Sequence, residues 1–375
     1  MSLQPKRGIA SLQTCPHGGI NYTELKALGI DPETVMDFSV CTNPFMPPPG
    51  IKEIINNAPI EQYPDSGATD LTQRLSESLL VPAENILVGS GTTELIRLIA
   101  IAYFRNTGHV LLLEPTYGEY EVACQIAGTQ TVKYQAKEED NFTPKIDDVV
   151  GLIRRHLPQA VFICNPNNPT GKYLSQANIE AILDAINESL LIIDEAYVTF
   201  VEKGWNSLDL RKRNNVVVLR SMTKDYGLPG LRLGYAVAHR DIIKYLRPAL
   251  PPWNVNAVAQ KAGTAVLKQE EYLRQSLNKI QECKRYLTNE LSQLGFRILP
   301  SDAHYFLIKA GNATKLRLSL LKQGILVRDC TSFGLPEYIR IAPRTMPECK
   351  KLITAISKIT NSGEYTAAED SKKQI

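Results

Sequence analysis

The sequence predicts an α/β protein: a large, mostly parallel sheet domain with helices on both faces, followed by a smaller α+β domain. Between residues 85 and 238, short apolar and β-branched runs alternate with helical segments, as in chains that build parallel sheets. Beyond residue 250 a long helical run and short strands replace this alternation. The chain has 375 residues, of which 43% are hydrophobic, so it is long enough for two domains.

Four segments are expected along the chain. Residues 1–45 form an N-terminal segment that belongs with the small domain and covers the ligand site. Prolines at 44, 47, 48 and 49 exclude a helix where this segment ends. Residues 46–250 form the large domain and residues 251–361 the small C-terminal domain, and the polar tail 362–375 is expected to be disordered.

In the large domain, helices are placed by apolar residues that recur on one face and by capping residues. The segment 69–80 has apolar residues at 71, 75, 79 and 80, and Ser175 is a suitable cap for the helix after it. The expected helices span 51–57, 69–80, 95–104, 145–156 and 175–187. The expected strands span 85–88, 109–113, 130–135, 160–163, 190–193, 216–219 and 235–238.

The small domain begins with helices and continues with strands and helices interleaved. A helical run over 270–294 ends near Gly295, a residue type that commonly terminates helices. The other expected helices span 257–267, 314–323 and 347–359, with a further one at 22–28 in the N-terminal segment. The expected strands span 296–299, 305–309, 325–328 and 338–342.

Composition narrows the classes of partner. The net charge is +3, from 42 basic and 39 acidic residues, which argues against a nucleic-acid surface but allows small anionic substrates. The seven cysteines are widely spaced without a C-x-x-C pair, so neither a disulfide framework nor a metal site is indicated, and a reducing cytoplasm fits best. No signal-peptide pattern opens the chain, and its most apolar stretch, 95–104, is too short to span a membrane.

The stretch around Lys224 carries the strongest chemical signal. Lys224 is predicted to lie in a loop between two core strands, where a buried ammonium is costly unless it is paired or has reacted. Ser221, Thr223 and Arg232 lie close to it in sequence and suit a dianionic phosphate. Lysine and phosphate together suggest pyridoxal 5′-phosphate, although a surface lysine in a Gly/Pro-rich loop is the alternative.

A second phosphate signal lies at a strand-to-helix turn. Gly89 and Gly91, followed by Thr92 and Thr93, predict an anion site, because free backbone N–H groups and the helix dipole face the ligand there. As a dinucleotide fingerprint the turn is incomplete, since Glu94 replaces the third glycine. A nicotinamide oxidoreductase therefore stays only a weak alternative.

Two further motifs follow predicted strands, at the edge where open α/β sheets bind ligands. They read PNNPTG from Pro166 to Gly171 and DEAY from Asp194 to Tyr197. With the S-x-T-K lysine motif and Arg232 in this order, the sequence resembles the aminotransferase class I/II branch of the fold type I pyridoxal-phosphate enzymes. The resemblance extends over most of the chain between residues 43 and 340.

This resemblance implies roles for individual residues. Lys224 binds the cofactor aldehyde covalently and then moves protons, and Asp194 pairs with the pyridine nitrogen. Tyr197 and Asn168 donate to the phenolate oxygen of the ring, and Tyr117 stacks on its face. The cofactor phosphate is held by Gly91, Thr92, Thr93, Ser221, Thr223 and Arg232. Taken one at a time, these residues also fit ordinary strand-end, core and turn positions.

Tyr63, in Gln62-Tyr63-Pro64, resembles the tyrosine that this family lends to the cofactor phosphate of the neighbouring subunit. The resemblance implies a homodimer with shared active sites. A tyrosine in an ordinary turn is the alternative.

Two arginines near the C-terminus bear on the substrate. The resemblance places Arg328 and Arg340 as clamps for substrate anions, which suggests a phosphorylated amino-acid substrate. His17, Gly18, Gly19, Asn43 and Asn168 are the other expected substrate contacts. Two families within this branch fit, the threonine-phosphate decarboxylases of cobalamin biosynthesis and the histidinol-phosphate aminotransferases.

The N-terminal motifs favour the decarboxylase. His17-Gly18-Gly19, Thr42-Asn43-Pro44 and Arg344 resemble it, whereas Ile20 and the Cys41-Thr42 pair depart from it. The expected reaction is the decarboxylation of L-threonine O-3-phosphate to (R)-1-aminopropan-2-yl phosphate. The alternative is a histidinol-phosphate or related aminotransferase, and a non-catalytic regulator that binds the cofactor is a distant third.

Overall fold

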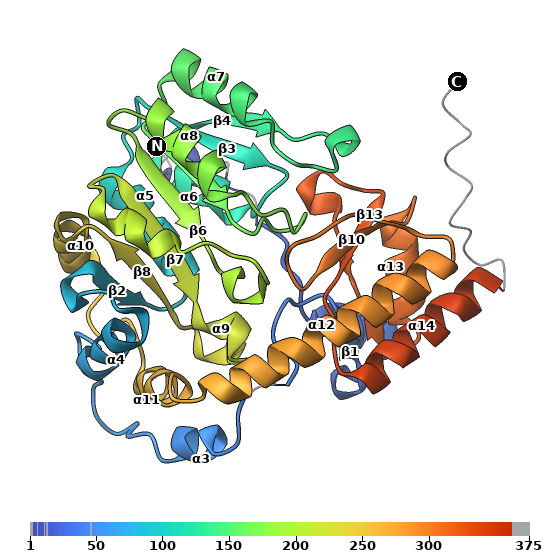
Figure 1. The fold of residues 1–375 in the computed structure, drawn as a ribbon. Coiled ribbons are helices and arrows are strands. Elements are labelled where there is room, and N and C mark those ends of the chain that lie inside the picture. The colour runs from blue at the N-terminus through green and yellow to red at the C-terminus, as the bar shows by residue number, and fades with distance from the viewer. Residues whose placement is uncertain (1–2, 6, 11, 13, 46, 362–375) are drawn as a thin grey trace.

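The computed structural model describes residues 3–361 except 6, 11, 13 and 46. Figure 1 shows two bodies, a large sheet domain and a smaller domain, with the long helix α12 (Glu270–Gln293) running from one to the other. The tail 362–375, expected to be disordered, lies outside the described residues. None of the helices in the described part of the chain is long and apolar enough to span a membrane.

The large domain is built on a seven-stranded sheet with the order β2-β8-β7-β6-β5-β3-β4. Neighbouring strands are parallel except that β8 runs antiparallel to both β2 and β7. The mostly parallel sheet predicted from the sequence is therefore confirmed. The strands are β2 (Ile86–Gly89), β3 (His109–Glu114), β4 (Gln130–Gln135), β5 (Ala160–Cys164), β6 (Leu190–Asp194), β7 (Val216–Ser221) and β8 (Gly234–Ala238).

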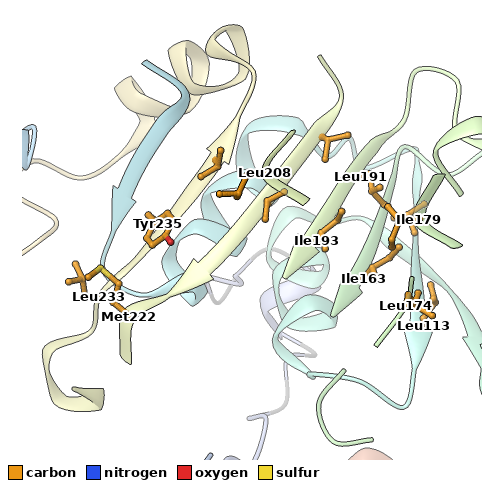
Figure 2. Close-up of a cluster of buried hydrophobic side chains, with 14 of the residues drawn as sticks. Leu113, Ile163, Leu174, Ile179, Leu191, Ile193, Leu208, Met222, Leu233 and Tyr235 are labelled. Atoms are coloured by element: carbon orange, nitrogen blue, oxygen red, sulfur yellow. The ribbon is translucent and has the colours of Figure 1, made fainter. Parts of the chain in front are cut away.

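Alternate side chains of the strands enter two separate core layers, as the period-2 geometry of strands requires. Val161 packs in the layer formed with α4 (Thr69–Leu79), α7 (Ile146–His156), α8 (Gln176–Ala185) and α11 (Ala257–Val266). Its neighbour Phe162 packs in the opposite layer with α5 (Thr92–Tyr103), α6 (Glu119–Ala127) and α10 (Arg240–Leu246). Figure 2 shows part of the first layer, including Ile163, Leu191 and Ile179.

The small domain has a four-stranded antiparallel sheet in the order β12-β13-β10-β9. Its strands are β9 (Arg297–Ile298), β10 (Phe306–Lys309), β12 (Arg328–Asp329) and β13 (Tyr338–Ile341), covered by α12, α13 (Ala313–Leu321) and α14 (Met346–Asn361). Separately, β1 (Met36–Asp37) of the N-terminal segment pairs in parallel with β11 (Ile325–Leu326). The remaining helices are α1 (Arg7–Ala10), α2 (Tyr22–Leu28), α3 (Ile51–Asn56) and α9 (Met222–Asp225).

Three sequence expectations need correction. Lys224 lies in the short helix α9, which Ser221 caps, and not in an open loop. The predicted strand 325–328 is divided between β11 and β12, which belong to different sheets. The helices α6 and α10 were not predicted, because each follows directly on a motif or strand and is short.

Candidate active site

A cavity of about 390 Å³ opens between the strand ends of the large domain and the small domain. Most of the residues singled out from the sequence line it, although they come from segments spread over the whole chain. They are His17, Gly18, Gly91, Thr92, Thr93, Tyr117, Asn168, Asp194, Tyr197, Ser221, Thr223, Lys224, Arg232, Arg328 and Arg340. The fold therefore gathers separate motifs at one place.

Lys224 is partly buried in the wall of this cavity. Burial is the largest influence on its amine and lowers the pKa of Lys224, and the positive charges of Arg232 and Arg340 act in the same direction. Its Nζ lies 6.0 Å from the centre of the Tyr197 ring. A lysine whose neutral form is favoured can act as a nucleophile and as a base.

The phosphate signals in the sequence meet beside this lysine. The Oγ of Ser221 lies 2.8 Å from Oγ1 of Thr223 and also accepts from the Thr223 backbone N–H. Gly91 precedes the first turn of α5 with φ of 79°, and a Cβ built on it would lie 2.8 Å from Nη2 of Arg232. Hydroxyls, a guanidinium and a helix N-terminus thus surround one pocket, as a bound phosphate requires.

Asp194 ends β6 and points into the cavity. Its Oδ2 accepts a hydrogen bond from the Tyr120 hydroxyl at 2.9 Å, and its Oδ1 accepts from the Ala196 backbone N–H at 3.0 Å. Burial raises the pKa of Asp194 to about 6, and both hydrogen bonds oppose that rise. The carboxylate is therefore held in one orientation and needs a cationic partner to stay fully ionised.

The aromatic residues form the walls around Asp194. Tyr117 contacts Tyr120 edge to face, with ring centres 5.5 Å apart, and its hydroxyl lies 3.3 Å from Oγ1 of Thr93. Burial raises the pKa of Tyr117 to about 12. Tyr197 packs edge to face on Tyr305 at 5.0 Å. Tyr117 and Tyr197 both line the cavity, so either ring is available to contact an aromatic ligand there.

Arg340 and Asn168 are joined by a hydrogen bond in which Nη1 of the arginine donates to Oδ1 of the amide. Nη2 of Arg340 donates to the Ser39 carbonyl at 2.6 Å. Because the amide oxygen of Asn168 faces Arg340, its Nδ2 donor faces the other way. This orientation fits a donor to an oxygen of a ligand ring, with a guanidinium beside it for a substrate anion.

Arg328 and His17 form the outer end of the cavity. Arg328 donates to the Pro16 carbonyl at 2.8 Å and to Oγ of Ser332 at 2.6 Å. Nε2 of His17 lies 3.2 Å from Oε1 of Glu119, whose Oε2 accepts from Arg97 at 2.9 Å. The hydrogen bond to His17 is the main influence that lowers the pKa of Glu119.

Some expected site residues lie elsewhere. Asn43 does not line the cavity, because its Nδ2 donates to the Asp225 carbonyl at 2.9 Å and contacts Oγ of Ser276 at 2.7 Å. These contacts tie α9 to α12, and the expected substrate contact of Asn43 stays a prediction. The N–H of Gly19 donates to Oγ of Ser39, and Gly19 is also absent from the cavity wall.

Two more residues are placed away from the cavity. Arg344, which supported the resemblance to the decarboxylases, pairs with Glu348 at 2.8 Å. Tyr63 is 76% exposed and stacks on Trp253 with ring centres 4.2 Å apart. Sequence reasoning in turn missed Tyr120, Glu119 and Arg97, which follow Tyr117 or Thr93 by a few residues on α6 and α5.

This fold, with a partly buried lysine beside a phosphate pocket and a buried carboxylate, defines a fold type I pyridoxal-phosphate enzyme. The family model for aminotransferase class I and II matches residues 33–356. The chain belongs to this family, whose cofactor is pyridoxal 5′-phosphate.

Individual relatives carry two names. The histidinol-phosphate aminotransferase of Thermoanaerobacter sp. (strain X514) is 33% identical over 312 residues, which cover 82% of this chain and 87% of that protein. A crystal structure of the histidinol-phosphate aminotransferase from Clostridium acetobutylicum matches with a TM-score of 0.78 and 28% identity, covering 87% of this chain and 99% of that one. The L-threonine-O-3-phosphate decarboxylase from Porphyromonas gingivalis matches with a TM-score of 0.76 and 27% identity, covering 86% and 99%.

The residues of the cavity fit the cofactor. Gly91, Thr92, Ser221, Thr223 and Arg232 would hold its phosphate, because they gather donors around one pocket that a Cβ on Gly91 would obstruct. Asp194 would face its ring nitrogen, since a buried carboxylate with a raised pKa gains most from a cationic partner.

Proposed function

We propose that this protein is a pyridoxal-phosphate-dependent aminotransferase that acts on histidinol phosphate or a closely related amine phosphate. The observation that carries the proposal is the Arg340–Asn168 pair, which sets a buried guanidinium beside the amide expected to hold the ring. Curated relatives that are 33% identical and named histidinol-phosphate aminotransferase support the same reading.

Bound cofactor supplies an electron sink and accepts the amino group, and the chain supplies position and proton transfer. Arg340 binds the carboxylate of the keto-acid partner and keeps that group beside Asn168. In the amine phosphate, the hydrogen on the carbon that bears the amino group is the one that reacts, and Nζ of Lys224 would remove it because burial favours the neutral amine. The hydrogen bond from Tyr120 holds the carboxylate of Asp194 in place. There its negative charge would stabilise the positive charge on the ring nitrogen of the cofactor.

Decarboxylation of threonine phosphate is the second candidate. It is favoured by Arg328 and His17, which both line the cavity and offer donors to a phosphate. If the phosphate group of threonine phosphate lies there, the α-carboxylate of the substrate does not bind Arg340 and can leave as carbon dioxide. The solved decarboxylase from Porphyromonas gingivalis supports this candidate at 27% identity. The relatives named histidinol-phosphate aminotransferase, 33% identical or slightly less, support the aminotransferase instead.

One experiment separates the two reactions. The purified protein is incubated with histidinol phosphate and 2-oxoglutarate, and separately with threonine phosphate alone, and the products are identified by mass. Glutamate formed in the first incubation, without carbon dioxide release in the second, supports the aminotransferase. Carbon dioxide release without a keto acid would assign the decarboxylase instead.

A pair of variants tests the role of Arg340. Arg340→Gln should raise the KM for 2-oxoglutarate at least about tenfold, because a charged hydrogen bond to the carboxylate is lost. Arg344→Gln is the matched control, since Arg344 pairs with Glu348 and does not line the cavity. Equal effects of the two substitutions would contradict the assignment.

A further inference from the structure

Three side chains with different ligand atoms meet at the outer end of the cavity. The Sγ of Cys15, the imidazole of His17 and the carboxylate of Glu119 all lie within 4.8 Å of one another. Nε2 of His17 and Oε1 of Glu119 are 3.2 Å apart. The mechanism proposed above uses neither Cys15 nor Glu119.

Thiolate, imidazole and carboxylate are the ligand types that zinc binds in proteins. With Zn–S of about 2.3 Å and Zn–N of about 2.0 Å, neighbouring donors of a tetrahedral zinc lie roughly 3.3–3.6 Å apart. The His17–Glu119 distance of 3.2 Å lies just below this spacing. Only the sulfur has to approach, and Cys15 and His17 lie in a stretch without regular secondary structure, so a small shift of that stretch suffices.

The neighbours of Glu119 orient its carboxylate toward His17. Glu119 is the first residue of α6, and Arg97 donates to its Oε2, which leaves Oε1 directed to His17. Hydrogen-bonded carboxylates of this kind are typical of metal sites, where the outer partner fixes the orientation of the ligand. The positive charge of Arg97 opposes a cation, but the thiolate and carboxylate together neutralise a dication.

Gly118 leaves room for the thiol of Cys15 because it has no side chain. A Cβ built on Gly118 would lie 2.6 Å from Sγ of Cys15, so any other residue at 118 would push the thiol away from Glu119. The side chain of His17 is 52% exposed, which gives an ion access from solvent. All seven cysteines lie in the described part of the chain, and Cys15 is the one that is not buried.

We propose that Cys15, His17 and Glu119 bind a Zn²⁺ ion at the mouth of the active-site cavity. The fourth coordination position is open to water or to an anion in the cavity. Binding replaces the proton on the Cys15 thiol, which is released to solvent, and the proton on Nε2 of His17, which moves to Nδ1 of the neutral ring; no electron is transferred.

Equilibrium dialysis of the cofactor-loaded protein against Zn²⁺ tests the site directly. One zinc ion per chain should bind, and Cys15→Ser and Glu119→Gln should each weaken binding at least about tenfold. Glu121→Gln is the matched control, because it changes the same helix at a carboxylate that pairs with Lys133 instead. Unchanged zinc affinity in both Cys15→Ser and Glu119→Gln would overturn the proposal.

A second measurement uses the wild-type protein and so does not depend on how variants fold. We expect iodoacetamide to alkylate Cys15 faster than the other six cysteines, as measured by mass spectrometry of the peptide that contains Cys15. Zn²⁺ should slow this alkylation at least about tenfold. A chelator should restore the rate. Alkylation of Cys15 at the same rate with and without zinc would overturn the proposal.

Zinc at this position engages the imidazole of His17, which is then no longer free to contact a substrate phosphate in the cavity. We therefore expect Zn²⁺ to raise the KM for the amine phosphate in the wild type but not in Cys15→Ser. This consequence rests on the proposed function, whereas dialysis and alkylation do not. Bound zinc with an unchanged KM would overturn the inhibitory role.

Discussion

Burial gives the amine of Lys224 its reactivity, because desolvation favours the neutral form. We expect Lys224→Ala to lower kcat/KM by about 10³-fold or more, since covalent capture and proton transfer are both lost. Borohydride reduction of the wild type should leave the cofactor mass on the peptide that contains Lys224. Lys172→Ala is the control, as Lys172 is partly buried but does not line the main cavity. A labelled peptide elsewhere would contradict the assignment.

Tyr120 controls the charge of Asp194 in a way that pH can reveal. Its hydroxyl donates to Oδ2 of Asp194 and lowers the carboxyl pKa, which burial has raised to about 6. Tyr120→Phe keeps the stacking on Phe162 but removes that donor, so the pKa should rise. The acid limb of the kcat/KM profile should then move to higher pH.

Two further variants, Asp194→Asn and Tyr134→Phe, serve as comparisons for Tyr120→Phe. Asp194→Asn should lower kcat/KM by several orders of magnitude at every pH, because the partner charge is gone. Tyr134→Phe should leave the profile in place, since its hydroxyl accepts from the Lys145 backbone outside the cavity. If the acid limb of the kcat/KM profile does not move in Tyr120→Phe, then Tyr120 does not influence the pKa of Asp194.

Sequence reasoning located residues of the site whose chemistry is unusual at their position. A lysine between core strands and acidic groups at a strand end can be recognised from a single chain, because burial makes them costly. Asn43 shows the limit of this reasoning, because a buried amide can also serve to join α9 and α12, as its hydrogen bonds do. Tyr120 and Glu119 carried no signal, since their importance comes from neighbours distant in sequence.

The N-terminus of α5 depends on one glycine. Gly91→Ala places a Cβ 2.8 Å from Nη2 of Arg232, so the guanidinium must leave the phosphate pocket. Loss of a charged hydrogen bond should weaken cofactor binding about tenfold or more, measured as the dissociation constant by absorbance titration. Gly50→Ala is the control, because φ is 83° there and nothing lies within 4 Å of the added Cβ.

Gly50→Ala should lower the free energy of unfolding by roughly 1 kcal/mol and leave the affinity for the cofactor unchanged. Weakened cofactor binding in Gly50→Ala as well would show that backbone strain, not displacement of Arg232, is responsible.

Helix α9 ends on Asp225, a partly buried residue whose carboxyl links stability to pH. Burial raises the pKa of Asp225 to about 7, from 3.8, although Thr199 donates a hydrogen bond to it. Between about pH 4 and 7 the folded protein therefore holds a proton that the unfolded chain releases. Stability contributed by this group is present at low pH and is lost as pH rises through that window.

Asp225→Asn should remove this dependence. The variant should be more stable than the wild type at pH 8 by an amount on the order of 2–4 kcal/mol, and the two should converge near pH 4. Unfolding midpoints measured from pH 5 to 8 give the comparison. Asp184→Asn, at an exposed position of α8, should change the midpoint little at any pH. A constant difference between Asp225→Asn and wild type would contradict the pKa assignment.

Elements with a clear apolar period were predicted almost to the residue. The helix expected over 69–80 is α4 (Thr69–Leu79), and Ser175 caps α8 as expected. Helix α6 was missed because it is short and Tyr120, Val122, Ala123 and Cys124 are all buried, which leaves only Glu121 and Gln125 to mark a polar face. The pairing of β1 with β11 joins residues about 290 apart, which local pattern cannot indicate.

At the scale of the whole molecule, the chain leaves two large aromatic side chains together on its surface. Tyr63 is 76% exposed and Trp253 45% exposed, and their rings stack at 4.2 Å. Tyr63 lies outside the cavity of its own chain, so it can reach a cofactor only in another copy. We propose a homodimer in which Tyr63 of each subunit contacts the cofactor phosphate of its partner.

Mixing two inactive or impaired variants tests this arrangement. In a hybrid of Tyr63→Phe with Lys224→Ala, one site combines the intact Lys224 of the first chain with the intact Tyr63 of the second, and its twin carries both changes. Activity of the mixture after subunit exchange should therefore exceed the mean of the two separate variants. If Tyr63 served its own subunit, every hybrid site would carry one defect and no gain would occur. Light scattering that gives a monomer at working concentration would end the proposal, because a shared site cannot exist without a second copy.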